Sequence, residues 1–523
     1  SLTEQFGVRS LEFSPEFGFK LNGKKMFLQG NANHHDLGAL GAACYDRAIE
    51  RMMLQLKSFG YNCIRCSHNP YSDSFARIAD RVGILVVDEL TDKWSNNDYW
   101  GGRQPFTHIW HKLITEWIKR DRNRPSIILW SLGNELQIRE GWAGFEGTND
   151  WGITTYNIFN QLVKRWDHTR LTTVAMFPAR AGAITRHDKE FNDYLVPPEL
   201  ACATEVASFN YQSDKYDVYL KYRPDLILFQ REAETSNLLQ PYYNMDRKRT
   251  VGMAYWGSVE YWGESNKWPK KGWNYSFFGH TMRPYPQAYL IKSAFMPEIP
   301  EVHIGVVDAA GAESVSWNDV VVGRMALNEC WNHTPGSRQS LFAFTNAHSV
   351  ELLVNGQSMG VQENDTTQAN RRNMIYWKDV PYGNGGSVVA IARDKSGKEV
   401  ARHHIETAGK AVALRIEAET PADWKADGMD LQYINVTAID KKGRPVWDYN
   451  EPLTLQMEGV ARLVALDNGD HYTDELFHGI TSKRMYQGRM QIILRSDQKA
   501  GNVMVKVFSA GLKGTLRLKT INE

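Results

Sequence analysis

The ten residues from Ser126 to Glu135 combine the pattern of a buried strand with two side chains suited to acid–base chemistry. Their sequence is an apolar, β-rich run that ends abruptly in the amide of Asn134 and the carboxyl of Glu135. Buried parallel strands have such runs, and barrel enzymes keep catalytic groups at the C-terminal ends of strands. An amide beside a carboxyl offers a partner for a sugar hydroxyl next to a proton-transferring acid. The alternative is a core strand that ends in a solvated loop.

Polar side chains also follow the other apolar runs of the first half of the chain. Two carboxyls on separate strands, with imidazole, amide, phenol and indole groups around them, suit hydrolysis of a glycosidic bond. One acid protonates the leaving oxygen, and the other attacks or stabilises the anomeric carbon. We interpret Asp88 and Glu89 as polar residues of a pocket floor rather than as a metal site. The other candidates are Asn31, Asn33, His34, His35, Asp36, Arg65, Ser67, His68, Asn69, Asn134, Glu135, Asn210, Tyr211, Arg231, Glu232, Glu234, Trp256 and Glu260.

Positioning these groups requires a sheet whose strands all end at one face. Short apolar strands alternate with amphipathic helical segments between residues 20 and 295, which predicts a (β/α)8 barrel. A doubly wound sheet is the alternative, but no G-x-G-x-x-G follows the first strand. The predicted strands are 26–29, 62–66, 84–88, 127–131, 171–175, 206–210, 226–229 and 253–256, with helices including 46–59, 72–82 and 109–121.

The pattern changes near Pro297, after which the chain is rich in alternating strands. Asn355-Gly356 follows an apolar strand and predicts a hairpin turn. Two successive blocks look like β-sandwiches of about 100 residues each. We therefore predict an α/β chain in which a (β/α)8 barrel is followed by two immunoglobulin-like β-sandwich domains. The expected boundaries are a remnant of a preceding β-sandwich or linker at 1–17, the barrel at 18–298, a sandwich at 299–408 and a C-terminal sandwich at 409–523.

Composition narrows the class of protein. The 523 residues include 61 basic and 60 acidic side chains, and this balance argues against a nucleic-acid partner. No apolar run is long enough for a membrane span. The five cysteines imply no disulfide framework, and we interpret the C-x-x-C of Cys63 and Cys66 as buried thiols rather than as a redox or zinc motif.

Several segments carry a family resemblance: 19–24, 29–38, 62–70, 86–89 and 122–135 in the predicted barrel, and 344–347, 350–356, 426–428 and 467–470 in the later blocks. Together they resemble glycoside hydrolase family 2, the family of β-galactosidases, β-glucuronidases and β-mannosidases. The resemblance covers about 280 residues and implies the barrel fold with glycosidase activity. The later blocks resemble the β-sandwich domains that follow the barrel in β-galactosidase-like members. The start at Phe6 resembles the end of the domain before the barrel, so we expect the usual N-terminal sugar-binding and first immunoglobulin-like domains to be lacking.

The resemblance also implies roles for individual residues. Glu135 would be the general acid/base, and a glutamate at the end of strand seven would be the nucleophile. Glu232 matches the family's spacing there, but Glu234 would share its strand face, so periodicity does not separate the two. Residues that would bind the sugar, orient the nucleophile or wall the pocket are Asn134, His35, Asp36, Arg65, His68, Tyr211 and Trp256.

The sugar is inferred from two further segments. His34 to Gly41 most resembles β-galactosidase-like members, and the region from Gly272 to Phe278 lacks the N-x-K motif with which glucuronidases hold the uronate. We interpret Lys267, Lys270 and Lys271 as scattered lysines of an exposed loop. The sharper hypothesis is that this loop meets an acidic or sulfated glycan.

These inferences lead to one main function and several alternatives. We expect a retaining exo-acting β-galactosidase that removes terminal β-galactose from oligo- or polysaccharides, with no cofactor and no metal. The alternatives are a β-glucuronidase, a β-mannosidase and a carbohydrate-binding scaffold without activity. A homo-oligomer is compatible with the sequence, and a periplasmic or secreted location is favoured over the cytoplasm.

Overall fold

Contacts divide the chain into two compact units in the computed structural model. The first comprises Ser1–His35, Met53–Ser258 and Ser316–Val322, and the second Asp36–Met52, Val259–Val315 and Gly323–Glu523. The described residues are 6–94, 106–136, 152–177, 196–265, 267–308, 312–317 and 320–522.

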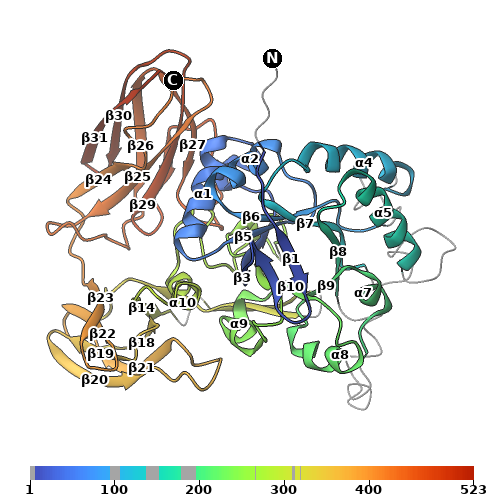
Figure 1. The fold of residues 1–523 in the computed structure, drawn as a ribbon. Helices are drawn as coiled ribbons and strands as arrows, with labels where there is room; N and C mark the ends of the chain where they lie inside the picture. Colours follow the sequence, from blue (N-terminus) through green and yellow to red (C-terminus); the bar gives the residue numbers. More distant parts are fainter. Residues whose placement is uncertain are drawn as a thin grey trace. The chain divides into compact units, whose positions relative to one another are not determined.

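The first unit contains a closed barrel of parallel strands, as predicted (Figure 1). Each strand pairs with the next along the chain, and the last, β11, pairs with the first, β4. Because all strands are parallel, their C-terminal ends meet at one face. The barrel strands are β4 (Leu28–Asn33), β5 (Cys63–Cys66), β6 (Leu85–Glu89), β7 (Ile127–Asn134), β8 (Leu171–Met176), β9 (Val206–Asn210), β10 (Leu228–Ala233) and β11 (Gly252–Trp256).

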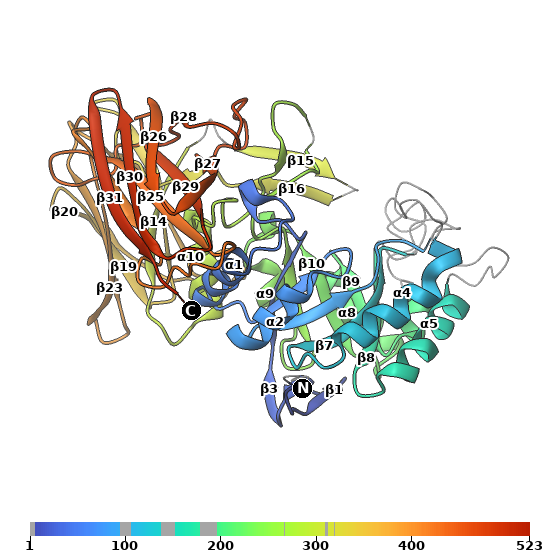
Figure 2. The same cartoon turned by 90° about the horizontal axis from the view of Figure 1, so that it is seen from above.

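Helices follow most barrel strands and pack outside them. α4 and α5 lie side by side in both views (Figures 1 and 2). α2 has a well-defined start, because Ser72 Oγ accepts a hydrogen bond from Phe75 N at 3.2 Å, and it ends at Gly83 with φ +76°. The helices are α1 (Asp46–Ser58), α2 (Asp73–Val82), α4 (Phe106–Asp121), α5 (Ile153–Trp166), α7 (Glu199–Ala203), α8 (Tyr216–Tyr222) and α9 (Gln240–Asn244).

A small antiparallel sheet packs against the N-terminal end of the barrel. It consists of β1 (Leu11–Ser14), β2 (Gly18–Leu21) and β3 (Lys24–Met26). Phe19 from this sheet is buried in one apolar cluster with Leu28 at the start of β4 and Val251 before β11. Apolar side chains therefore fill the barrel at this end, and polar chemistry is left to the opposite end.

Three barrel strands end three or more residues later than predicted. The first was expected at 26–29, but β3 ends at Met26 and β4 runs on to Asn33. The fourth was expected to stop at Ser131, but β7 continues to Asn134. The seventh was expected to stop at Phe229, but β10 continues to Ala233. All three extensions carry polar residues that are buried inside the barrel, which a search for apolar runs misses.

The second unit contains two β-sandwiches, which confirms the predicted fold class. Each pairs two four-stranded antiparallel sheets around its own apolar cluster. The first has sheet orders β17-β14-β18-β21 and β20-β19-β22-β23, and the second β24-β25-β29-β27 and β28-β26-β30-β31. The strands are β14 (Val302–Val307), β17 (Leu327–Asn328), β18 (Arg338–Thr345), β19 (Ser349–Val354), β20 (Gln357–Glu363), β21 (Met374–Pro381), β22 (Ser387–Arg393), β23 (Glu399–Glu406), β24 (Ala413–Ala418), β25 (Leu431–Ile439), β26 (Pro452–Gly459), β27 (Ala461–Asp467), β28 (Ser482–Arg484), β29 (Arg489–Ser496), β30 (Gly501–Ser509) and β31 (Leu512–Thr520).

The hairpin predicted at Asn355-Gly356 is confirmed between β19 and β20. Both turn residues have positive φ, +50° and +80°, which matches the twist of a two-residue hairpin loop. Further short elements are β12 (Tyr261–Trp262), β13 (Gly272–Trp273), α10 (Pro286–Phe295), β15 (Glu313–Trp317) and β16 (Val320–Arg324). Among the described residues, no helix has the length and apolar character needed to cross a membrane.

Candidate active site

Glu232 lies in β10 with both carboxylate oxygens engaged. Arg65 of β5 donates from Nη1 to Oε1, and the Tyr211 hydroxyl, just after β9, donates to Oε2 at 2.6 Å. The residue is 3% exposed. Donors on both oxygens fix the direction of the carboxylate. This geometry suits an anionic group that attacks or stabilises an electrophilic carbon.

Glu89, at the end of β6, is the centre of a buried ionic cluster that shares Arg65 with Glu232. Arg65 donates to Glu89 from Nε at 3.1 Å and from Nη2 at 3.0 Å, and Arg231 pairs with the same carboxylate. His68 Nδ1 lies 2.6 Å from Glu89 Oε1. Burial alone would raise the pKa of Glu89, but the two guanidiniums hold it well below its usual range. The cluster thus fixes Arg65 in front of Glu232.

Two asparagines connect the carboxyl groups. Asn134 Oδ1 accepts from Arg65 Nη2 at 2.8 Å and from Asn210 Nδ2 at 2.9 Å. Asn210 Nδ2 also donates to Glu135 Oε1 at 3.3 Å. A continuous chain of hydrogen bonds therefore runs from Glu135 through both amides to Arg65, which in turn holds Glu232.

Glu135 has a less well paired environment. Lys93 Nζ lies 3.8 Å from its Oε2, while the same ammonium lies only 2.6 Å from Asp92 Oδ1. Burial raises the pKa of Glu135 to about 8; the Lys93 cation opposes this rise, and the charge of Glu232 adds to it. Glu135 therefore keeps its proton at neutral pH, as a general acid must.

The backbone is strained at two of these positions. Glu135 has φ +50° and Tyr211 has φ +57°, a region that residues other than glycine rarely occupy. Each directly follows an asparagine that ends a barrel strand, Asn134 or Asn210. Such conformations cost about 1–3 kcal/mol and concentrate at functional sites. Here they turn the two side chains away from the strand direction at the face where the carboxyls lie.

An aromatic face accompanies the cluster. The His68 ring is stacked on Trp256, at the end of β11, with centroids 5.2 Å apart and planes 7° apart. His34 meets the same indole edge-on at 5.2 Å. Flat faces of this kind pack against the apolar side of sugar rings.

Of the two neighbouring histidines, the structure brings His34 to this face and gives His35 a different setting. The contacts of His35 are with Tyr71 and Phe75, at 4.7 and 6.0 Å between ring centroids, and with Ser72 Oγ at 3.4 Å. His35 thus packs against the start of α2. The role expected for His35 fits the position of His34 better.

Glu234 is separated from Glu232 by the geometry of β10. A bulge lies between Gln230 and Glu232 in the pairing with β9. Glu234 comes after the strand, where it accepts from Asn237 Nδ2 at 3.1 Å and lines a cavity with Ser213. The hydrogen bonds of Arg65 go to Glu232, so the geometry favours Glu232 over Glu234 as the partner of Glu135.

Asp36 and Lys270 are among the predicted residues that lie in the second unit. Asp36 accepts from Gly38 N at 2.9 Å and from Trp262 N at 3.1 Å, so its carboxylate holds local backbone. Lys270 was expected in an exposed loop, and this was wrong. It is 2% exposed, its Nζ lies 3.4 Å from Glu313 Oε2, and it covers the Tyr275 ring at 3.9 Å. An ion pair and an aromatic ring are thus available to keep this lysine inside, and a glycan contact through Lys270 is not supported.

Cys63 and Cys66 are buried thiols, as predicted. Each is 1% exposed and neither forms a disulfide. Burial raises the pKa of Cys63 to about 12, so its thiolate is not available at neutral pH.

Four residues were missed or undervalued. Asp92 and Lys93 lie beyond the predicted end of their strand. The sequence signal that could have indicated them is a carboxylate directly followed by a lysine. Asn210 and Arg231 were among the candidates, but neither was given a role. The bulge in β10 lets Arg231 point inward together with Glu232.

Paired carboxyls at the ends of strands four and seven of a parallel barrel are typical of glycosidases built on this fold. Comparison with known proteins agrees. Residues 16–248 match the model described as glycosyl hydrolases family 2, TIM barrel domain, and residues 414–516 match glycoside hydrolase family 2 C-terminal domain 5. Residues 336–401 match a domain of unknown function. The chain belongs to glycoside hydrolase family 2.

Individual relatives extend over nearly the whole chain. A β-galactosidase of Bacteroides ovatus, BoGH2A, is 28% identical over 98% of this chain and 63% of its own length. A Formosa agariphila protein, named provisionally as a β-glucuronidase, is 42% identical over 99% of this chain and 50% of its own length. The structure of a family 2 member from Bacteroides cellulosilyticus matches with a TM-score of 0.86 at 27% identity, covering 99% of this chain and 65% of that one. This chain thus spans about half to two thirds of these relatives.

Proposed function

We propose that this chain carries the catalytic machinery of a retaining, exo-acting β-glycosidase. Glu135 would be the general acid/base and Glu232 the nucleophile. The observation that carries the proposal is the unequal environment of the two carboxyls. Glu232 has a cation and a phenol on its oxygens, whereas burial raises the pKa of Glu135 to about 8. Opposite environments of this kind assign the acid and the anion of a pair.

The reaction would proceed in two displacements. Glu135 donates its proton to the glycosidic oxygen while a Glu232 oxygen attacks the anomeric carbon, and the leaving alcohol departs. Glu135, now ionised, then takes a proton from water, the water oxygen attacks the anomeric carbon, and Glu232 is released. Atoms and charge balance with water as the only co-reactant.

The charge of Glu232 would couple the two steps. It adds to the raised pKa of Glu135, so it favours the protonated acid before the first step. Esterification removes that charge, and the pKa of Glu135 falls when the residue has to act as a base. Lys93, at 3.8 Å, stabilises the ionised form in this second role.

Asn134 has a restricted capacity for binding a hydroxyl. Its Oδ1 already accepts from Arg65 and Asn210. Its Nδ2 donates to Asp92 at 3.0 Å and lies 3.3 Å from His68 Nε2. A sugar 2-hydroxyl would therefore replace the longer contact with His68, since the amide has no further donor.

A terminal β-galactoside is our first candidate substrate, and a β-glucuronide is the second. The galactoside is supported by the β-galactosidase-like sequence around His34 and by the similarity to BoGH2A. The glucuronide is supported by the relative with 42% identity, whose provisional name is β-glucuronidase. A buried Lys270 paired with Glu313 is a poor candidate for holding a uronate.

Hydrolysis of a panel of nitrophenyl β-glycosides tests the proposal. We expect one sugar to dominate, with the β-anomer as the first product seen by NMR. Glu232→Gln should lower kcat by about 10⁴-fold or more, while Glu234→Gln should change it by less than about 10-fold. Glu135→Gln should spare activated dinitrophenyl substrates in the first step, because their leaving group needs no proton.

Three results would overturn parts of the proposal. An inverted first product would exclude double displacement. Turnover that survives Glu232→Gln but not Glu234→Gln would move the nucleophile. Absence of turnover by a folded chain, with sugar binding retained, would favour a carbohydrate-binding scaffold.

A further inference from the structure

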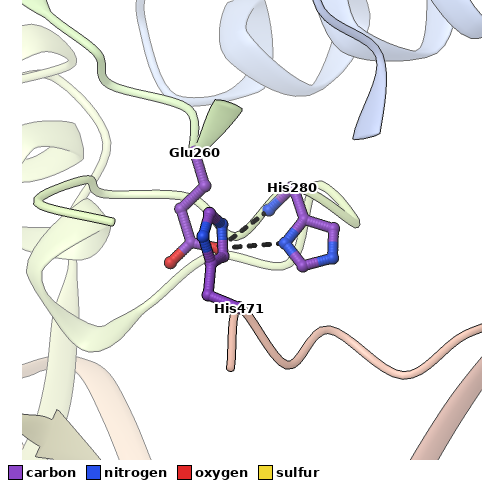
Figure 3. Close-up of side chains that lie close together, drawn as sticks. All are labelled: Glu260, His280 and His471. Atoms are coloured by element: carbon purple, nitrogen blue, oxygen red, sulfur yellow. Dashed lines mark hydrogen bonds and ion pairs between the residues drawn. The ribbon is translucent and has the colours of Figure 1, made fainter. Parts of the chain in front are cut away.

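Three buried side chains of the second unit point toward one another. None of them takes part in the proposed reaction. Glu260 follows β11, His280 lies between β13 and α10, and His471 follows β27 (Figure 3). Glu260 is 2% exposed, and each histidine is 4% exposed. Their ligand atoms lie within 4.8 Å of one another. Buried groups of this chemistry are costly unless they are paired or bind a metal.

The distances match a set of donors around one ion. His280 Nδ1 lies 3.2 Å from Glu260 Oε2, and His471 Nε2 lies 3.0 Å from the same oxygen. Two ligands on a tetrahedral zinc ion, bound at about 2.0–2.2 Å, are about 3.3 Å apart. A small inward adjustment of bond angle would therefore accommodate the ion without moving the backbone.

His471 points to a missing partner. Nε2 faces Glu260 Oε2 at 3.0 Å, but Nδ1 has no hydrogen-bond partner within the described ranges, although the side chain is 97% buried. Its backbone is fixed, because the carbonyl accepts from Lys271 N at 3.2 Å. A buried imidazole whose backbone is held and whose ring has one unpaired nitrogen needs a further partner, and a metal ion shared with Glu260 and His280 would supply one to the cluster.

The surrounding groups support the same arrangement. His280 Nε2 lies 2.9 Å from Asp467 Oδ1, which leaves Nδ1 free to face Glu260. The Tyr285 hydroxyl donates to Glu260 Oε1 at 2.8 Å, on the side away from the histidines. Metal-binding histidines usually give their second N–H to a carboxylate, and metal-binding carboxylates are themselves hydrogen-bonded.

We propose that Glu260, His280 and His471 form a binding site for a zinc-class divalent cation. Two imidazole nitrogens and one carboxylate oxygen form a donor set that zinc accepts, with a fourth position for water. Asp467 and Tyr285 are the outer partners that orient the ligands. Arg324 and Lys270 are cations that also act on Glu260, so they oppose binding electrostatically.

The site would connect two parts of the second unit. Trp262 packs against both imidazoles, with ring centroids 4.6 Å from His280 and 4.8 Å from His471. The Trp262 backbone N donates to Asp36 at 3.1 Å. A bound ion would therefore hold the turn at His471 against the segment around Trp262, which positions Asp36. Loss of the ion would leave the turn at His471 less firmly held.

A second histidine–glutamate group serves as an internal control. His303, Glu329 and His403 also lie within ligand distance of one another. However, the rings of His303 and His403 are stacked with centroids 4.0 Å apart, and His403 Nδ1 accepts from Ile304 N at 3.0 Å. Face-to-face rings do not direct two nitrogens at one ion, so we place no metal there.

Zinc binding to the full chain tests the proposal. The chain is prepared as Cys44→Ser, because Cys44 is an exposed thiol that could bind zinc itself. After treatment with a chelator, we expect calorimetry and elemental analysis to give one zinc ion per chain at pH 7. Zinc should raise the melting temperature, and the chelator should reverse the rise. Cobalt should give the visible absorption of a tetrahedral site.

Variants connect the binding to these residues. His471→Ala and Glu260→Gln should each lower zinc affinity by about 100-fold or more. Asp467→Asn, which changes an outer partner, should lower it by about 10–100-fold. His403→Ala is the control and should leave zinc affinity unchanged. Circular dichroism checks that each variant is folded, and His471→Gln provides a second variant if His471→Ala does not fold. Equal zinc binding by the parent and His471→Ala would overturn the proposal. So would a folded parent that binds no zinc, because His280 would then be a proton-bridged partner of Asp467 and Glu260. None of these readouts depends on glycosidase activity.

Discussion

The cluster around Glu89 and the cluster around Glu260 both bury carboxylates, but their positive partners differ in kind. Glu89 faces the guanidiniums of Arg65 and Arg231, which are charged at neutral pH. Glu260 faces His280 and His471, which can be neutral, protonated or metal-bound. One cluster therefore carries a fixed charge pattern, and the other a pattern that depends on what is bound.

The difference matches the demands on each site. Glu232 needs the same electrostatic surroundings in every reaction cycle, and a guanidinium with several fixed donors supplies them. Arg65 donates to Glu232, Glu89 and Asn134 at once. In the second cluster the partners are imidazoles, which can exchange a proton for a metal ion, so this cluster suits a site whose occupant can change.

Removing the fixed cation should give the largest effect. Arg65→Met would remove one of the positive charges that balance the buried carboxylates of Glu89 and Glu232. Breaking a buried ion pair in this way costs about 3–5 kcal/mol. We expect urea unfolding to show a loss of this size, and kcat/KM to fall by at least about 100-fold. Arg65→Lys keeps the charge but not the fork of donors, so it should be intermediate. Parental stability in Arg65→Met would show that the cluster is not held by this charge.

Neutralising the two central carboxyls compares the clusters directly. Glu89→Gln leaves two arginines that cannot lose their charge, so we expect a loss of about 3–5 kcal/mol in the free energy of unfolding. Glu260→Gln in chelator-treated protein should cost about half as much, because an imidazole, unlike a guanidinium, can lose its charge, and because His280 keeps its contact with Asp467. Urea unfolding of both variants under one set of conditions measures the difference. Equal losses would remove the distinction between fixed and adjustable partners.

A smaller change is expected from Lys93, which lies near the proposed acid. Because the pKa of Glu135 is raised to about 8, its protonated form is present below that pH and is lost as the pH rises through it. The alkaline limb of kcat/KM should therefore lie near pH 8. Lys93→Met removes a cation that favours the ionised form, so the limb should move upward by about one unit, or about 1.4 kcal/mol. Lys93→Arg should leave it in place, and a downward shift in Lys93→Met would contradict the assignment.

The fold was largely predictable because its signals are local. Eight apolar strands spaced by amphipathic helices predicted the barrel, and the turn at Asn355-Gly356 predicted its hairpin. The errors lie where buried polar residues extend a strand, as in β4 and β10. Hydrophobic periodicity carries no information there, since the barrel interior is polar at the end that holds the carboxyls.

The site was only partly predictable. Strand ends and family resemblance brought forward Glu135, Glu232, Arg65 and Tyr211, which the structure joins in one hydrogen-bond network. The inward direction of Arg231 depends on a bulge that no pattern in the chain announces. Burial of Lys270 depends on Glu313, which lies 43 residues away in sequence. Contacts between distant segments therefore set the limit of what spacing alone can predict.

The left-handed backbone at Glu135 makes this position an unusual starting point for protein engineering. A glycine adopts φ +50° without strain, so Glu135→Gly should unfold in urea no more readily than the parent. Removal of the side chain also opens a space, lined by Asn210 and Lys93, of the size of a small carboxylic acid. Added formate or azide should then restore turnover of activated substrates in a concentration-dependent way, whereas Glu135→Val, with a β-branched side chain at the same φ, should fold poorly.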